Sequence, residues 1–275
     1  MVRKIYRKLI FVQVCMCAVA VVGVIIDTSL VGNFYGVNSL AAVGLVAPLE
    51  NIIFVIASIF GLGVQVVCSI SIGKLDNRKA SSQLTSGLLF SIAIAFVCIF
   101  IIYTFLDNIL IAAGAEFDTD VYLKAKEYTR GVLPTYITGC LGACLMYLLQ
   151  INGKQNLCIA SIIIYVVSIV GLDLLNIFVI KMDLFGMGLA TAISDYICVA
   201  FLMVAYFFSK TSIRIKFSLF NIKHFKEIFT SGFISSVFAI YNALLILLIN
   251  NIVMQNIGSD AVASITVIFS LSGIL

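Results

Sequence analysis

Long apolar runs separated by short polar segments dominate the chain. They predict membrane-spanning helices at residues 9–32, 39–72, 82–106, 122–151, 157–180, 186–208 and 230–256, and an eighth that starts near Ala261 and runs into the C-terminus. Helices of about 20 residues or more cross a hydrocarbon core of ~30 Å. None of the runs alternates apolar and polar positions as a strand does. The pattern therefore predicts an all-α integral membrane protein.

Composition supports this class. Of the 275 residues, 62% are hydrophobic and 11% are charged, and the mean hydropathy is +1.17. These values lie far from those of soluble domains. The 8 cysteines all fall within apolar runs and form no CxxC pair in a loop, so they are interpreted as small hydrophobic residues rather than metal ligands or disulfide partners.

The charges between the runs divide into two faces. The acidic face carries Asp107, Glu116, Asp118, Asp120, Asp183 and Asp260. The other face carries most of the 17 basic residues, including the N-terminal MVRKIYRK and a stretch between Lys210 and Lys226. By the positive-inside rule the basic face and the N-terminus are cytoplasmic, and we expect a multi-pass protein of the plasma membrane. The first run is too long for a signal peptide and is interpreted as a retained helix.

An internal repeat suggests how the chain is organised. GVNSLAAVGLVAPLENII, from Gly36, aligns without gaps on GSDAVASITVIFSLSGIL, from Gly258. An even number of predicted spans separates the copies, so they keep the same orientation and form parallel repeats. The expected domains are a six-helix lobe at 1–209, a cytoplasmic amphipathic linker at 210–229 that lies on the membrane surface, and an incomplete second lobe at 230–275. We expect the segment after Lys210 to pack poorly.

Four acidic residues lie inside the apolar runs, and they are the main candidates for function: Asp27, Glu50, Asp173 and Asp195. A carboxylate at membrane depth costs at least ~2.5–3.5 kcal/mol, so it usually faces a protein-lined cavity and handles protons, ions or charged substrates. At ~1.5 Å per residue, all except Glu50 fall in the outer half of the membrane.

Polar neighbours extend this set. Thr191 and Asp195 are four residues apart and share a helix face. A cluster with Asp27 and Asp173 would hold a proton on a desolvated carboxylate or bind Na⁺ through oxygen atoms. Asn176 and Asn242 are further candidates for polar residues of the cavity. For each acid, the alternative is a buried carboxylate that serves packing alone, and for Asn242 it is an interhelical hydrogen bond.

Enzyme motifs are absent from the sequence. It contains no HExxH, GxSxG, Walker A or GxGxxG and no Cys/His ligand spacing, so neither an enzyme nor a cofactor is predicted. The topology accounts for the net charge of +4, and no nucleic-acid partner is needed to explain it.

Three segments resemble a known family. DTSLVGNFYGVNSLAAVGLVAP (27–48), GLGVQVVCSISIGKLDNRKA (61–80) and LDLLNIFVIKMDLFGMGLATAIS (172–194) are similar to the N-terminal lobe of the multidrug and toxic compound extrusion (MATE) transporters. The resemblance implies a two-lobed antiporter, driven by H⁺ or Na⁺, that expels cationic or amphipathic compounds. On the matching motifs Asp27 and Asp173 take the places of the cation-coupling acids, with Na⁺ a candidate ion there, and Thr191 that of a neighbouring hydroxyl.

The sequence leaves two alternatives to efflux open. A flippase for lipids or lipid-linked precursors shares this helix arrangement, but we would expect basic residues in its cavity. A truncated, non-transporting membrane protein is the other. Expected partners are small molecules, membrane lipids, and a second lobe or a second copy of the chain.

Overall fold

The computed structural model describes residues 2–209 and 213–272, and over this part of the chain it contains helices and connecting turns but no strand. The all-α prediction is therefore confirmed. The elements are α1 (Val2–Tyr35), α2 (Val37–Gly73), α3 (Asn77–Ala112), α4 (Asp120–Val132), α5 (Thr135–Ile151), α6 (Gln155–Leu175), the π-helical turn η1 (Asn176–Ile180), α7 (Asp183–Phe208), the 3₁₀ turn η2 (Phe217–Leu219), α8 (His224–Ser235), α9 (Val237–Asn256) and α10 (Ser259–Ser272).

Six helices in the described ranges are long and apolar enough to cross a membrane, or seven if the bent pair α4 and α5 forms one span. The chain is thus a multi-pass membrane protein. Two of the expected spans are interrupted within their length and are not single continuous helices. The run at 122–151 bends by 46° between α4 and α5, where Pro134 lacks an amide donor and its ring crowds the preceding turn. The run at 230–256 breaks at Ser236, between α8 and α9.

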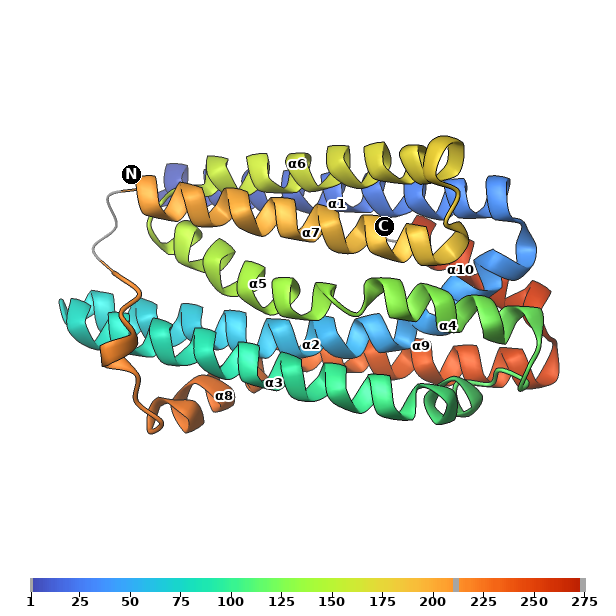
Figure 1. The fold of residues 1–275 in the computed structure, drawn as a ribbon. Coiled ribbons are helices and arrows are strands. Elements are labelled where there is room, and N and C mark those ends of the chain that lie inside the picture. Colours follow the sequence, from blue (N-terminus) through green and yellow to red (C-terminus); the bar gives the residue numbers. More distant parts are fainter. Residues whose placement is uncertain (1, 210–212, 273–275) are drawn as a thin grey trace.

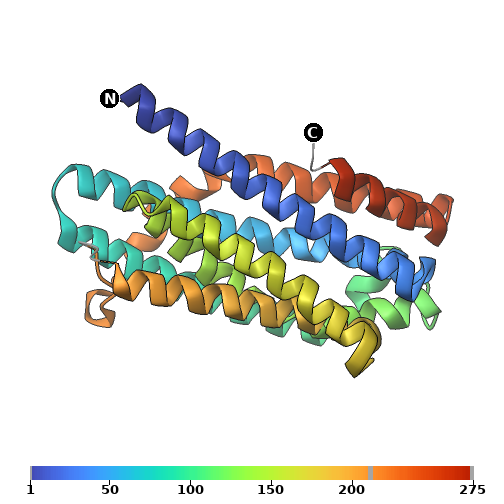
Figure 2. The same cartoon turned by 90° about the horizontal axis from the view of Figure 1, so that it is seen from above.

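The helices run along one bundle axis, and α2 is its central element (Figures 1 and 2). It packs against α3, α4, α5, α8, α9 and α10. Helices α1, α6 and α7 form the adjacent wall, in which α6 contacts both α1 and α7. The start of α1, the α2–α3 turn and the segment before α8 lie at the same end of the bundle (Figure 1). This basic end carries the face that the sequence predicts to be cytoplasmic.

The segment after α7, expected as an amphipathic linker at 210–229, is bound to the helix bundle where the structure describes it. Lys210 lies outside the described residues, and from Ile213 the chain docks on hydroxyl groups of α3 and α7. The amides of Arg214 and Lys216 donate to the hydroxyl oxygens of Ser81 and Thr85, both at 3.1 Å. The segment therefore makes fixed contacts with protein, because the α3 hydroxyls satisfy its extended backbone.

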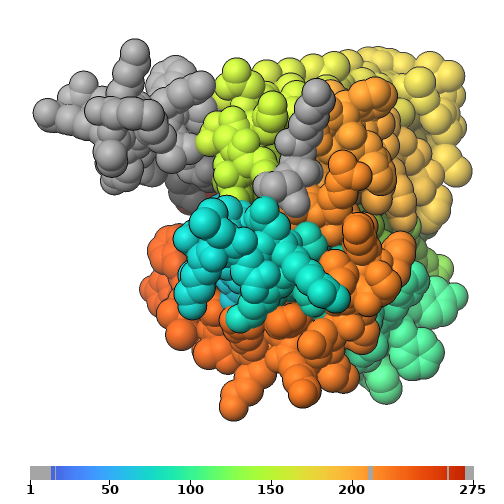
Figure 3. Space-filling model, turned by 90° about the vertical axis from the view of Figure 1, so that its left-hand side faces the viewer, coloured from blue at the N-terminus to red at the C-terminus, as the bar shows by residue number. Residues whose placement is uncertain are grey.

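Helix α8 extends across residues 229 and 230, where the sequence analysis places the boundary between the linker and the second lobe. It packs tightly against α2, whereas the sequence analysis expects poor packing after Lys210. A Cβ at Gly63 on α2 would collide with the backbone oxygen of Ile228, and one at Gly232 on α8 with the backbone oxygen of Ile59. The two backbones come this close because both glycines lack a side chain. Figure 3 shows this end of the molecule, with the α2–α3 turn in cyan and α8 and its preceding segment in orange.

The two repeat copies begin with the same backbone conformation. Gly36 precedes α2 with φ 83°, and Gly258 precedes α10 with φ 107°. Positive φ values favour glycine at these turns. The aligned segments therefore adopt the same turn-then-helix structure as far as α10 is described, which supports the repeat.

Candidate functional site

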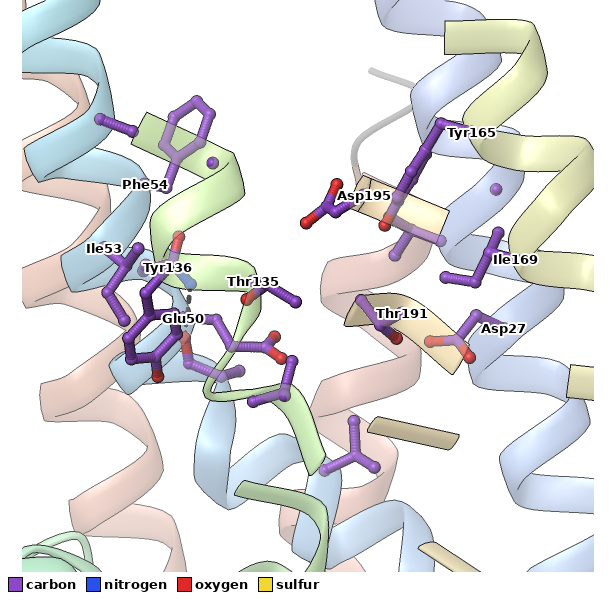
Figure 4. Close-up of a pocket in the computed structure, with 18 of the residues that line it drawn as sticks. Asp27, Glu50, Ile53, Phe54, Thr135, Tyr136, Tyr165, Ile169, Thr191 and Asp195 are labelled. Carbon is purple, nitrogen blue, oxygen red and sulfur yellow. Dashed lines mark hydrogen bonds between the residues drawn. The ribbon is translucent and has the colours of Figure 1, made fainter. Parts of the chain in front are cut away.

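A cavity of about 740 Å³ lies inside the bundle. One wall comes from α1, α6 and α7 and the other from α2, α4 and α5, and α9 and α10 contribute Ile246, Asn250, Thr266 and Phe269. Figure 4 shows the two walls, with Asp27, Thr191 and Asp195 on one and Glu50 on the other. Three of the four predicted acids, Asp27, Glu50 and Asp195, thus meet around one cavity although they are far apart in the sequence.

Asp27 and Asp173 form an acidic pair at the first wall. Asp27 on α1 is half-buried and lines the cavity. Asp173 on α6 is 0% exposed and is not among the lining residues. The two carboxyl groups are close enough to interact, but neither oxygen of Asp173 meets hydrogen-bond geometry with any described partner. Asp173 therefore lies behind Asp27: its carboxyl group is shielded from solvent, and the neighbouring carboxyl group of Asp27 is partly exposed to the cavity.

Thr191 and Asp195 lie one turn apart on α7 and both line the cavity, as their spacing predicts. The Thr191 hydroxyl donates to the backbone oxygen of Met187 at 3.2 Å. This bond uses its proton and leaves oxygen lone pairs for a ligand. The Asp195 side chain points into the cavity, with the ring of Tyr165 on α6 nearby (Figure 4).

Glu50 lies on the opposite wall, where it follows Pro48 on α2. The Tyr128 hydroxyl on α4 donates to its Oε1 at 3.2 Å, and the carboxylate points into the cavity (Figure 4). Tyr136 on α5 also lines this wall, and its buried hydroxyl has no hydrogen-bond partner among the described residues. The bend at Pro134 places Tyr128 and Tyr136, from the two halves of one predicted span, on the same cavity.

The two asparagines predicted as cavity residues lie elsewhere. Asn176 is 2% exposed and belongs to the turn between α6 and α7. Its side-chain amide donates to the Tyr35 hydroxyl at 3.1 Å and to the Asp183 carbonyl at 3.0 Å, and its oxygen accepts from the Met182 amide at 3.0 Å. Asn242 on α9 is half-buried and is not a lining residue.

Asn250, also on α9, lines the cavity instead and was missed by the sequence analysis. It is 3% exposed, and its side-chain amide donates to the Gly44 carbonyl at 2.6 Å. Asn250 lies near the end of an apolar run, where polar residues at the membrane–water interface are common. The sequence pattern therefore gave no reason to predict Asn250 rather than Asn242 as a cavity residue.

The described charged side chains that line the cavity are all acidic. Its described lining includes three carboxylates, from Asp27, Glu50 and Asp195, and no Lys, Arg or His. Aromatic rings of Tyr128, Tyr136, Tyr147, Tyr165 and Phe54 lie between them. Such a lining attracts cations by charge and by cation–π contact. Within the described chain, no group of three or more His, Cys, Asp or Glu side chains is arranged to hold a metal ion.

Comparison with known proteins gives consistent matches. The MatE family model matches residues 13–180. The multidrug export protein MepA of Staphylococcus aureus is 23% identical over 262 residues, which cover 90% of this chain and 54% of MepA. The chain thus spans about half the length of this relative.

Two solved structures share the fold. The MATE multidrug transporter DinF-BH superposes with a TM-score of 0.90 at 20% identity over 98% of this chain and 60% of its own. An inward-facing multidrug resistance MATE transporter of the MOP superfamily superposes with a TM-score of 0.83 at 21% identity, over 94% of this chain and 57% of its own.

Proposed function

The chain belongs to the MatE family, whose members are secondary multidrug transporters rather than enzymes, and we propose that it serves the efflux of cationic or amphipathic small molecules coupled to inward movement of H⁺ or Na⁺. MepA and DinF-BH, which are named as multidrug transporters, support this proposal. The main observation in its support is the cavity, which is lined by acidic and aromatic side chains and lies between helices that also bear the pair Asp27 and Asp173.

The substrate class follows from the lining. A cationic amphipath would place its charge near Glu50 or Asp195 and its apolar body against the tyrosine and phenylalanine rings. A lipid phosphate would instead meet three carboxylates without a compensating Lys, Arg or His among the described lining residues. This charge pattern favours cation efflux over flipping of lipids or lipid-linked precursors.

Coupling is assigned to Asp27, Asp173 and Thr191. Two desolvated carboxylates that face each other repel when both are ionised, so one bound cation between them relieves the repulsion. A proton shared by the pair does this, and Na⁺ does so with help from the Thr191 oxygen. Because Asp27 also lines the cavity, loading the pair changes the charge that the substrate meets, which gives a physical link between ion and substrate.

Orientation in the plasma membrane is part of the proposal. The start of α1, the α2–α3 turn and the segment before α8 gather at one end of the bundle (Figure 1), and the sequence is rich in Lys and Arg at all three places. The positive-inside rule supports a cytoplasmic location for this end. When the basic end of the bundle faces the cytoplasm, Asp27 and Asp173 lie in the outer half of the membrane.

Transport by vesicles of known orientation tests the proposal. The chain is reconstituted into liposomes, and a fluorescent monocation is followed under separately imposed pH and Na⁺ gradients. We expect gradient-driven movement of the cation with one of the two ions, and little movement of an anionic dye of similar size. Equal leakage of both dyes, or no gradient-dependent movement at verified orientation, would contradict the proposal and favour a non-transporting membrane protein.

A further inference from the structure

A second hollow lies outside the bundle, at its basic end. This groove has a volume of about 390 Å³ and lies between the start of α3 and the segment that leads into α8. Its lining includes Arg78, Lys79 and His224, together with Ser82 and Ser218. It is separate from the central cavity, with which it shares no lining residue.

Hydrogen bonds fix the walls of the groove. The Ser82 hydroxyl on α3 donates to the Leu219 carbonyl at 2.5 Å, and the Asn221 amide donates to the Ser86 hydroxyl oxygen at 3.0 Å. The Nε2 of His224 lies 3.2 Å from the Ser82 Oγ. These contacts join parts of the chain that are far apart in sequence, so the groove is held open as part of the fold.

The positive charges of Arg78 and Lys79 in the groove are poorly neutralised, whereas His224 lies 3.4 Å from Glu227. Arg78 makes no ion pair in the described part of the chain. Lys79 is 3.8 Å from Glu227, but their side chains are 47% and 45% exposed, and such pairs bind weakly. The acid of the groove, Asp76, uses its Oδ1 to accept the Lys79 amide at 2.9 Å as the cap of α3.

Exposed apolar side chains indicate the depth of the groove in the membrane. Phe217 and Ile222, in the segment that forms one wall, are 75% and 70% exposed, and Phe208 at the end of α7 is 85% exposed. Large apolar residues beside unneutralised cations are typical of a surface at the boundary between acyl chains and headgroups. We therefore expect the groove to lie at the depth of the lipid phosphates.

We propose that this groove is a binding site for the phosphate of an anionic lipid headgroup. Arg78 supplies two parallel N–H donors to the phosphate oxygens, as guanidinium groups commonly do. Lys79 adds a point charge, and the exposed Ser218 hydroxyl adds a donor. The acyl chains extend along Phe217 and Ile222. Because its walls come from α3 and from the segment before α8, the lipid bridges the two elements. The site is independent of the efflux proposal.

Native mass spectrometry of the purified chain tests the site. The protein is titrated with phosphatidylglycerol, phosphatidylcholine and glycerol phosphate, and bound copies are counted. We expect tighter binding of phosphatidylglycerol than of phosphatidylcholine. The double variant Arg78→Gln/Lys79→Gln should weaken phosphatidylglycerol binding by about tenfold or more, since each cation near an anionic surface is worth about a fivefold factor.

Two further variants keep the test decisive. Lys74→Gln removes one positive charge from the α2–α3 turn, against two in the double variant, and Lys74 does not line the groove. Diffuse attraction therefore predicts about half the free-energy loss of the double variant for Lys74→Gln, and a specific groove predicts almost none. Ser218→Tyr fills the groove without changing charge and should weaken binding, which covers the case of a double variant that fails to fold. An equal loss of binding free energy per removed charge in Lys74→Gln and the double variant would overturn the site in favour of diffuse attraction. Binding of glycerol phosphate as tight as that of the lipid would overturn the assignment to a membrane lipid.

Discussion

Gly44 on α2 packs directly against Thr266 on α10, and these residues occupy equivalent positions in the repeat copies that begin at Gly36 and Gly258. A Cβ at Gly44 would lie 3.2 Å from the Cβ of Thr266 and would collide with its hydroxyl oxygen. Equivalent residues of two rotated copies touch only near the axis that relates them. For the parallel repeat that the sequence predicts, this contact places the axis between α2 and α10, beside the central cavity.

The first prediction concerns this contact. Gly44→Val should destabilise the fold by about 1–3 kcal/mol, because the added side chain overpacks the contact between α2 and α10. Thermal unfolding in detergent measures the effect. Gly171→Val is the matched control, since a Cβ at Gly171 would have no atom outside its own helix within 4 Å. Equal losses in the two variants would show that the contact does not limit stability.

The second prediction concerns the buried acids. Asp27→Asn and Asp173→Asn should each reduce gradient-driven transport to the level of protein-free vesicles while leaving expression intact, because the amide removes a desolvated charge but keeps the side-chain shape. The double variant should lose no more than either single variant, as expected for residues that act as one unit.

Asp183→Asn serves as the control for these variants. Asp183 is exposed at the start of α7 and is not a cavity residue. The Asp183→Asn variant should transport the dye at the wild-type rate. Normal transport by Asp27→Asn or by Asp173→Asn would rule out the coupling assignment.

The third prediction separates substrate binding from ion coupling. Tyr128→Phe deletes the 3.2 Å hydrogen bond to Glu50, which typically contributes about 0.5–1.5 kcal/mol, so the Kd for a cationic dye should rise by roughly 2- to 10-fold. Glu50→Gln removes the charge itself and should weaken binding of the cation more than binding of a neutral analogue. Fluorescence titration in detergent measures both. Equal weakening for the charged and neutral dyes would argue for a packing role of Glu50.

The fourth prediction concerns helix α8. Limited proteolysis in detergent should leave α8 of the wild type protected, because Gly63 and Gly232 allow its backbone to lie against that of α2. Gly232→Val should expose it and accelerate cleavage between α7 and α8. Gly73→Val is the control, since Gly73 is exposed and a Cβ there would have no neighbouring atom within 4 Å. Rapid cleavage before α8 in the wild type would contradict this packing.

Hydrophobic patterning alone determined the class of this protein and most of its helices, because a bilayer requires long apolar segments with internally paired backbones. It also identified Asp27, Glu50, Asp173 and Asp195, since charged groups at membrane depth are costly enough to be conspicuous. The four-residue spacing of Thr191 and Asp195 was sufficient to predict that they line the same cavity, because residues four apart share a helix face regardless of the neighbouring helices.

Tertiary structure decided what depends on neighbours. The sequence contains Pro134 at the 46° bend after α4 and the pair Ser235 and Ser236 at the break before α9. Neither was sufficient to predict an interruption, because membrane helices also tolerate proline and serine where neighbouring helices satisfy the backbone. The different positions of Asp27, at the cavity, and Asp173, behind it, depend on the rotation of α1 and α6 against their neighbours. The docking of the segment before α8 depends on hydroxyl groups of α3 far away in sequence. A sequence records which side chains are polar, but only packing determines which of them meet.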